Sequence, residues 1–209
     1  MGTRYVQASI RTLVNPDDPA DVLAMAKAQD GVKVYQSDPG TFQIPNWDYA
    51  SLAKLTKAIV QMGPWLPDSR RIFGTQAETD PVRHLIGTAG GIFGISERDA
   101  LYFTRFPKNN DGTTPYSLTV RDVPVNAFWS ITVYNKDGFY EAPENAISLN
   151  SYTARKGADG SYTIHFGGDP KAPNYLRIMP GWNYIVRLYR PKAEILDGSW
   201  KFPEALPGG

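Results

Sequence analysis

The sequence predicts an α+β protein in which a short helical N-terminal segment packs on a mostly antiparallel β-sandwich of jelly-roll character. Apolar residues recur at helical spacing up to about residue 95, and from residue 100 they alternate with polar residues in short stretches. No helical pattern separates these stretches, so neighbouring strands can pair antiparallel. We therefore expect a helical linking segment, 1–95, and a β-sandwich domain, 96–209, which form one compact unit.

The first helix is expected over residues 19–29. Asp17 or Asp18 can cap it, because a short carboxylate side chain accepts the free N–H groups of a first helical turn. Pro19 lies in that turn, where a missing N–H costs least.

Two further helices are expected before residue 95. The second follows Asn46 as its cap and ends at Gly63-Pro64. The third begins at Asp80-Pro81 and ends in "GTAGGIFG", which we interpret as a flexible break. The second helix carries an apolar stripe made of Leu52, Leu55, Ile59 and Met62.

The strands are expected in the second half of the chain, where β-branched and aromatic residues alternate with polar ones. Asp-Gly pairs at 137–138 and 159–160 favour tight turns, because glycine adopts positive φ without steric cost. An antiparallel sandwich or jelly roll buries many aromatic faces at once. The predicted strands lie in 100–106, 115–122, 127–135, 161–167 and 182–190.

Composition excludes several classes of protein. Basic and acidic residues, 22 and 21 of them, are dispersed along the 209-residue chain, which leaves no basic stripe for nucleic acid. No apolar run approaches the roughly 20 residues of a membrane span, and the start has no export signal. We expect a soluble protein with neither a nucleic-acid partner nor a membrane span. It would be cytoplasmic as given, or periplasmic if it belongs to a longer chain.

The chain has no cysteine and two histidines, His84 and His165. Disulfides, thiolate nucleophiles and multi-histidine metal centres are thereby excluded, and we expect no metal site and no cofactor. The sequence motifs of serine hydrolases, zinc proteases and P-loop proteins are also absent.

The stretch "AFWSITVYN" separates its side chains onto two faces. Phe128, Ser130, Thr132 and Tyr134 share one face, and Trp129, Ile131 and Val133 share the other. One face belongs to the core. The face with Ser130, Thr132 and Tyr134 has the mixed polar and aromatic character of a pocket lining, although an ordinary outer face alternates in the same way.

Two arginines interrupt apolar strands, Arg105 in "YFTRF" and Arg187 in "YIVRLYR". Strand alternation places Arg187 on one face with Ile185 and Tyr189. If this face points inward, the buried guanidinium needs either a structural carboxylate or an anionic ligand.

His84 follows Arg83 on the third predicted helix. It is either a surface histidine bonded to a carbonyl or a proton donor that faces the sheet. The second role requires a carboxylate within hydrogen-bond reach, which Asp99, Asp122 or Glu144 could supply. For His165, strand alternation favours a solvated face.

Four blocks carry a resemblance to a known family: "DPVRHLIGTAGG", "DVPVNAFWSITVYNKDGFY", "GADGSYTI" and "PGWNYIVRLYRPKAEILDGSWKFPEA". Over about residues 70–206 the chain resembles the bacterial family catalogued as domain of unknown function 1214, which usually follows a partner domain catalogued as 1254. Residues 1–69 resemble the region that links the two domains. The resemblance implies a β-sandwich of jelly-roll character and no settled reaction.

Three functional hypotheses follow, and the choice between enzyme and binding protein stays open. The first is a module that binds a small molecule or carbohydrate through aromatic stacking and an anion-binding arginine. The second is a hydrolase or lyase with His84 or Tyr134 as general acid or base and Arg187 stabilising negative charge. The third is a structural subunit that covers a partner domain. Edge strands and apolar patches favour a homo-oligomer or a partner domain in each case. The predicted ligand-binding residues are Arg105, Trp129, Asn183, Arg187 and Tyr189.

Overall fold

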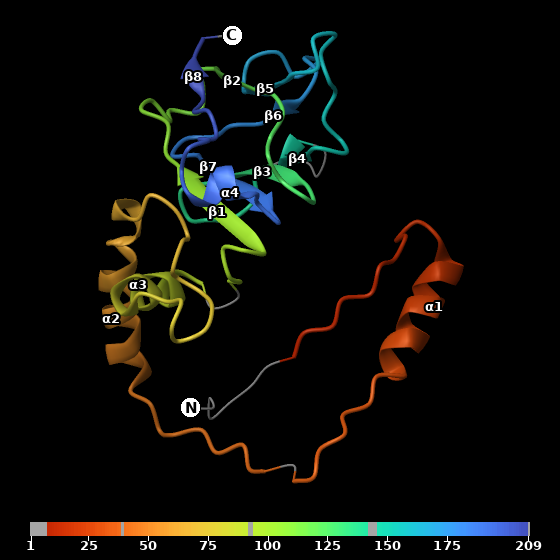
Figure 1. The fold of residues 1–209 in the computed structure, drawn as a ribbon, viewed down its shortest axis with the longest axis vertical. Helices are drawn as coiled ribbons and strands as arrows, with labels where there is room; N and C mark the ends of the chain where they lie inside the picture. The colour runs from red at the N-terminus through yellow and green to blue at the C-terminus, as the bar shows by residue number, and fades with distance from the viewer. Residues whose placement is uncertain (1–7, 39, 92–93, 142–145, 209) are drawn as a thin grey trace. The chain divides into compact units, whose positions relative to one another are not determined.

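The computed structural model describes residues 8–38, 40–91, 94–141 and 146–208. Contacts within the chain divide it into two units, Met1–Asn46 and Trp47–Gly209, and the strands of the described residues lie in the second (Figure 1). Residues 47–95, which we assigned to the linking segment, therefore lie in one unit with the strands. A domain boundary near residue 95 stays a prediction.

The first unit contains helix α1, Pro19–Asp30, where the sequence predicted a helix. The carboxylate of Asp18 accepts the N–H of Ala20 at 2.9 Å, and Pro19 occupies the first turn as expected. None of the residues of α1 is buried.

Helix α2, Tyr49–Val60, confirms the second predicted helix but begins after a different cap. The prediction of Asn46 was wrong, because the carboxylate of Asp48 accepts the N–H groups of Ala50 and Ser51 at 3.1 and 3.0 Å. The hydroxyl of Ser51 also donates to Asp48, and this hydrogen bond is the largest cause that lowers the pKa of the carboxyl. A short 3₁₀ helix, η1, follows at Gly63–Trp65.

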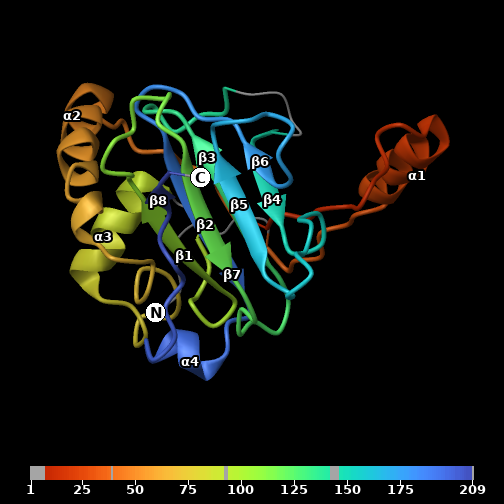
Figure 2. The same ribbon diagram turned by 90° about the horizontal axis from the view of Figure 1, so that it is seen from above.

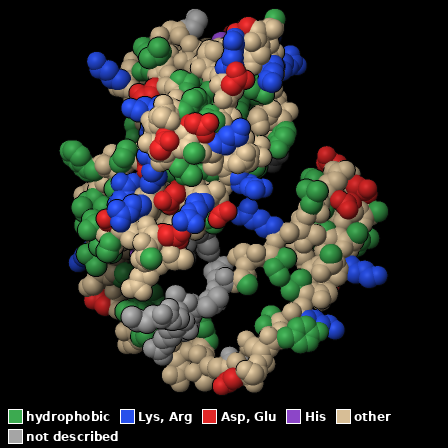
Figure 3. Space-filling view, viewed as in Figure 1, with side chains coloured by type: hydrophobic (Ala, Val, Ile, Leu, Met, Phe, Trp, Pro, Cys, Tyr) green, Lys and Arg blue, Asp and Glu red, His purple; other side chains and the backbone are tan. Residues whose placement is uncertain are grey.

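The apolar stripe of α2 is not covered by a sheet. None of the residues of α2 is buried, and the helix packs mainly against α3. Leu55 is 59% exposed, and Figure 3 shows hydrophobic side chains at the surface of this helix. The expectation that the helices pack on the strands therefore needs correction for α2, since helical periodicity shows which residues share a face but not what covers that face.

Helix α3, Pro81–Gly90, begins where the sequence predicted. The carboxylate of Asp80 accepts two N–H groups of the first turn at 3.0 Å. Near its end a Cβ atom at Gly87 would lie 2.0 Å from the Ile72 side chain, so only glycine allows this close approach. Residues 92–93 of the predicted flexible break lie outside the described residues. Among the residues described, no helix has both the length and the apolar character to cross a membrane.

Eight strands of the described residues form two four-stranded sheets, and Figure 2 shows α3 beside β1. All pairings are antiparallel except that of β5 with β6. The first sheet has the order β1 (Ala100–Arg105), β7 (Asn183–Tyr189), β3 (Trp129–Tyr134) and β4 (Ser148–Asn150). The second has the order β6 (Tyr175–Leu176), β5 (Tyr162–Phe166), β2 (Tyr116–Val120) and β8 (Leu206–Pro207).

The structure confirms the five longest strands at the predicted places. Strands β4, β6 and β8 were not predicted, because two or three residues are too few to show an alternating pattern. The Asp-Gly turns are also present, since Gly138 and Gly160 have φ angles of 83° and 84°. A one-turn helix, α4 (Ala193–Leu196), follows β7.

One buried cluster receives side chains from both sheets. Ile131 and Leu188 come from the first sheet, and Leu118 and Ile164 from the second, each no more than 2% exposed. Burying such a side chain stabilises the fold by roughly 1.5–3 kcal/mol. The structure thus has helices and two antiparallel-rich sheets around a shared core, and the jelly-roll connectivity stays a prediction.

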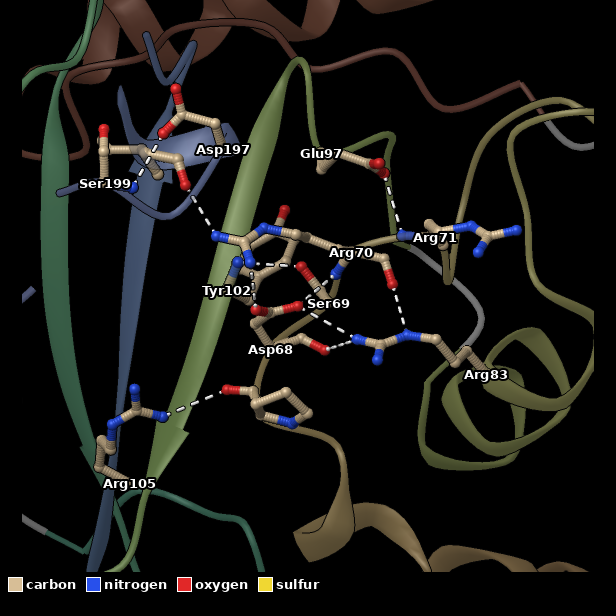
Figure 4. A network of polar contacts seen from close by, with 12 residues as sticks. Asp68, Ser69, Arg70, Arg71, Arg83, Glu97, Tyr102, Arg105, Asp197 and Ser199 are labelled. Carbon is tan, nitrogen blue, oxygen red and sulfur yellow. Dashed lines mark hydrogen bonds and ion pairs between the residues drawn. The ribbon is translucent and has the colours of Figure 1, made fainter. Parts of the chain in front are cut away.

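A network of charged groups connects α3 to the segment before it (Figure 4). The side chain of Asp68 is 7% exposed and forms ion pairs with Arg70 at 3.2 Å and with Arg83 at 3.1 Å. Arg83 also donates to the backbone carbonyls of Asp68 and Arg70 at 2.8 and 2.7 Å. Arg83 is thus committed to structural contacts.

The same segment docks on strand β1 and on α4. Ser69 donates its N–H to the carbonyl of Tyr102 and accepts the N–H of Tyr102 on its hydroxyl, at 3.1 and 2.9 Å. Arg70 donates to the carbonyl of Ile195 in α4 at 2.7 Å. These bonds fix α3, and with it His84, relative to the first sheet.

Candidate functional site

The face of the first sheet that points away from the core carries Arg187. Tyr184, Val186 and Leu188 are at most 2% exposed and form part of the core. Arg187 therefore lies on the opposite face with Ile185 and Tyr189, as strand alternation predicted. We call this surface the Arg187 face, and it consists of Phe128, Ser130, Thr132, Tyr134, Tyr140, Ile185, Arg187 and Tyr189.

Arg187 is half-buried and has neutral partners. Its Nη1 donates to the Thr132 hydroxyl at 3.0 Å and its Nη2 to the Tyr134 hydroxyl at 2.5 Å. The guanidinium carbon lies 5.8 Å from the centre of the Tyr134 ring. Within the described ranges no carboxylate forms an ion pair with Arg187. A guanidinium has five N–H donors, so it retains donors and its full charge for a ligand.

Tyr134 forms a pair with Tyr140, which lies on the loop after β3. The two rings stack with their centres 5.3 Å apart. The hydrogen bond with Tyr134 is the largest cause that raises the pKa of Tyr140, while the positive charge of Arg187 lowers it. Tyr140 therefore stays protonated at neutral pH and can act as a hydrogen-bond donor.

The loop that carries Tyr140 is held by Asn135, which is 6% exposed. The side-chain oxygen of Asn135 accepts the N–H groups of Asp137 and Phe139 at 3.0 and 2.9 Å. Its side-chain nitrogen donates to Glu141 at 2.6 Å. Asn183 donates to the carbonyl of Asn135 at 3.1 Å. Asn183, which the sequence predicted as a ligand-binding residue, is 8% exposed and holds this loop through its hydrogen bond to Asn135.

A second group of rings lies toward the other end of the Arg187 face. Tyr189 stacks on Phe128 with ring centres 4.2 Å apart, and Phe128 contacts Tyr152 at 5.6 Å. Because a strand rises about 3.3 Å per residue, the backbone of Tyr189 lies about 7 Å from that of Arg187. The cation is thus flanked by aromatic rings along the strand.

Two other predicted ligand-binding residues do not join this face. Trp129 is 2% exposed and packs edge-on against Tyr162, with ring centres 5.2 Å apart, so it belongs to the core. Arg105 forms an ion pair with Glu204 at 3.3 Å and donates to the carbonyl of Pro67. We therefore leave both residues out of the candidate site.

His84, the predicted acid or base, is exposed on α3. Its Nδ1 lies 2.7 Å from the carbonyl oxygen of Ile72, and this distance assigns a proton to Nδ1. Among the residues described, neither Asp99 nor Asp122 forms a hydrogen bond with the imidazole. Glu144, the third expected partner, lies outside the described residues.

His165 and the acidic residues offer no alternative centre in the described part of the chain. His165 is half-buried in β5, where it pairs with Ser117. Over those residues no group of three His, Cys, Asp or Glu side chains could hold a metal ion.

Three cavities of about 410, 630 and 660 Å³ lie elsewhere in the second unit. Arg187 lines none of these three cavities. Arg105 lines the third of them, next to Glu204.

Sequence reasoning missed Asn135 and Tyr140 as parts of the site. Both belong to "NKDGFY", where the Asp-Gly pair predicted only a turn. The available signal was the asparagine before this pair, because asparagine side chains often accept hydrogen bonds from the N–H groups of a following turn.

Residues 99–193 match the family model described as "Protein of unknown function (DUF1214)". No curated protein matches the chain. A crystal structure of the VPA0106 protein from Vibrio parahaemolyticus is 24% identical with a TM-score of 0.59, over 100% of this chain and 59% of that one. A crystal structure of an uncharacterised protein from Burkholderia cenocepacia is 17% identical with a TM-score of 0.38, over 92% of this chain and 42% of that one. The first likeness shows the fold alone, and the chain spans less than two thirds of either protein.

Proposed function

We propose that this protein binds a small molecule or glycan at the Arg187 face. The proposal starts from the match of residues 99–193 to the DUF1214 family model, whose description names no function. The ligand carries a carboxylate next to a ring. The observation that supports the proposal most strongly is that the half-buried guanidinium of Arg187 donates its hydrogen bonds to two neutral hydroxyls, those of Thr132 and Tyr134. Partial burial of a charge without a counter-charge is unfavourable, and an anionic ligand supplies that counter-charge.

The surroundings of Arg187 suit such a ligand. Thr132 and Tyr134 orient the guanidinium, so a carboxylate meets a preorganised donor pair. The ring of the ligand can then stack on Tyr140 or on Tyr189, and a stacked aromatic contact contributes about 0.5–1.5 kcal/mol. A sugar ring can use the same aromatic faces.

Calorimetric titration with matched ligand pairs tests this function. We expect glucuronate to bind more tightly than glucose, and benzoate more tightly than benzyl alcohol, because only the acids can pair with Arg187. Arg187→Ala should weaken binding of the acids by about 10- to 100-fold, the range for loss of a charged hydrogen bond. Arg187→Lys, which keeps the charge but loses the planar pair of donors, should bind with intermediate affinity.

Arg98→Ala is the matched control, since Arg98 is an exposed arginine paired with Glu78 elsewhere in the unit. Circular dichroism establishes that each variant folds. The proposal is refuted if neither acid binds the wild-type protein, or if a folded Arg187→Ala variant binds the acids as tightly as the wild type does.

We further propose that the scaffold of the site is a β-sandwich of jelly-roll character. The shared cluster of Ile131, Leu188, Leu118 and Ile164 supports facing sheets, because a single core needs the inner faces of both. The Arg187 face is then the outer surface of one layer.

A second candidate function is self-association through α2, which the exposed apolar stripe of this helix favours. Tyr49, Leu52 and Leu55 are 67%, 48% and 59% exposed and share one helical face. A twofold axis across α2 would set two copies antiparallel. Asp48 at the start of one helix would then lie near Lys57 in the last turn of the other, so the charges are complementary.

Light scattering coupled to size-exclusion chromatography tests this dimer. We expect the wild-type chain to elute as a dimer and Leu52→Glu/Leu55→Glu to elute as a monomer. Leu13→Glu places the same charge at another exposed leucine, 96% exposed, and should leave the dimer intact. A monomeric wild type, or a dimer that survives the double substitution, contradicts the interface.

A further inference from the structure

A cavity of about 630 Å³ lies beside β4 and β6, where the loops of residues 146–155 and 170–177 meet. Among the described residues that line it, three are basic, Arg155, Lys171 and Arg177, and none is acidic. The chain as a whole has a net charge of only +1, so the cavity concentrates positive charge locally.

The three basic side chains are exposed and have no ion pair with a carboxylate of the described residues. Asp169, which precedes the second loop, uses its carboxylate to accept the N–H of Lys171 at 2.9 Å and does not line the cavity. Like charges that line one cavity repel one another, and salt weakens this repulsion when the charges are exposed.

Asn174 fixes the walls of the cavity. Its side-chain nitrogen donates to the carbonyls of Arg155 and Thr163 at 2.8 Å, and its oxygen accepts the N–H of Arg155 at 2.7 Å. Asn174 has a φ of 56°, a left-handed conformation that asparagine adopts more readily than most residues. On the other side, Arg177 donates its N–H to the carbonyl of Ala146 at 2.9 Å.

We propose that this cavity binds a small polyanion, a molecule with two or three carboxylate or phosphate groups. The three cations can each pair with a negative group, and Leu149, Pro173 and Tyr175 offer an apolar surface to its carbon skeleton. The walls are formed before binding, so little ordering is needed. The site shares no residue with the Arg187 face, and it stands independently of the function proposed there.

Thermal melts and calorimetry with citrate and with pyrophosphate test the proposal and separate the carboxylate from the phosphate class. At matched ionic strength, we expect at least one of the two to raise the melting temperature, whereas acetate and sodium chloride should not. Arg155→Gln/Lys171→Gln/Arg177→Gln should weaken binding at least about tenfold. Without ligand this variant should be as stable as the wild type or more so, because the repulsion is gone.

A charge-matched control distinguishes the cavity from nonspecific attraction. Lys33→Gln/Lys192→Gln/Lys201→Gln removes three exposed positive charges outside the cavity and should keep wild-type affinity. The single variant Arg177→Gln changes the chain less than the triple variant does. We expect it to lose only part of the affinity for the polyanion. Equal affinity in the two triple variants, or no response of the wild type to either polyanion, overturns the proposal.

Discussion

Replacing Asp68 by asparagine should destabilise the second unit by about 2–3 kcal/mol. The carboxylate of Asp68 is the acidic partner of both Arg70 and Arg83, and its side chain is 7% exposed. Asparagine keeps the size and an acceptor oxygen but loses the charge, so two guanidinium groups lose their ion-pair partner. Breaking a buried ion pair on one side costs about 3–5 kcal/mol. The arginine side chains are 32% and 24% exposed, and we lower the expected cost because water partly solvates them.

Thermal and urea unfolding followed by circular dichroism measure this loss. Unfolding entropy is about 2.1 cal/mol/K per residue, or about 0.3 kcal/mol/K for a unit of roughly 160 residues. A loss of about 2–3 kcal/mol therefore corresponds to a melting temperature about 6–9 °C lower.

Asp137→Asn is the control, because it removes a carboxylate from an exposed pair with Lys136. Such pairs contribute about 0–1 kcal/mol. If Asp68→Asn melts within about 2 °C of the wild type, or no lower than Asp137→Asn, the ion pairs of Asp68 in Figure 4 do not stabilise the second unit.

Three further predictions concern the turns and the loop of the site. Gly112→Ala should cost at least about 3 kcal/mol in urea unfolding, because the added Cβ would lie 2.5 Å from neighbouring backbone at a φ of 83°. Gly160→Ala, at a φ of 84° with no atom within 4 Å, should cost only about 1 kcal/mol, and equal costs would contradict the steric argument. Hydrogen bonds from Ser161 lower the pKa of Asp159 from 3.8 to about 2, so its contribution to stability is present above pH 3.8 and is lost as pH falls toward 2. Melting curves of Asp159→Asn should therefore depend less on pH in this range, and an unchanged slope would refute the assignment. Asn135→Ala should cost about 2–3 kcal/mol and weaken ligand binding at the Arg187 face, measured by urea unfolding and calorimetry; wild-type affinity would exclude a positioning role.

The longer strands and the helix starts could be predicted because each has a local physical cause. In β7, alternation over seven residues distinguishes the buried Tyr184, Val186 and Leu188 from their neighbours. Asp80 and Pro81 mark the start of α3 in the same local way. Which element packs on the apolar stripe of α2 has no local cause, because it depends on the three-dimensional fold. The prediction that this helix packs on the strands therefore failed.

The site could be predicted only in part for a related reason. Alternation correctly separated the two faces of the strands that carry Tyr134 and Arg187, but it left open whether the face with Arg187 points toward the core. Their contact depends on the register of β3 with β7, in which Ser130 is the residue paired with Arg187. A guanidinium then reaches along the neighbouring strand to the Tyr134 hydroxyl. Register is set by long-range pairing, which one sequence does not display.

The position of β7 in the first sheet has a consequence for how the chain is synthesised. This strand lies between β1 and β3, yet among the strands described only β8 follows it along the chain. During translation β1 and β3 are synthesised before β7, the strand that lies between them. Until β7 is present, Leu101 and Ile131 lack the core contacts that β7 supplies. Closure of the first sheet therefore waits for residues 183–189.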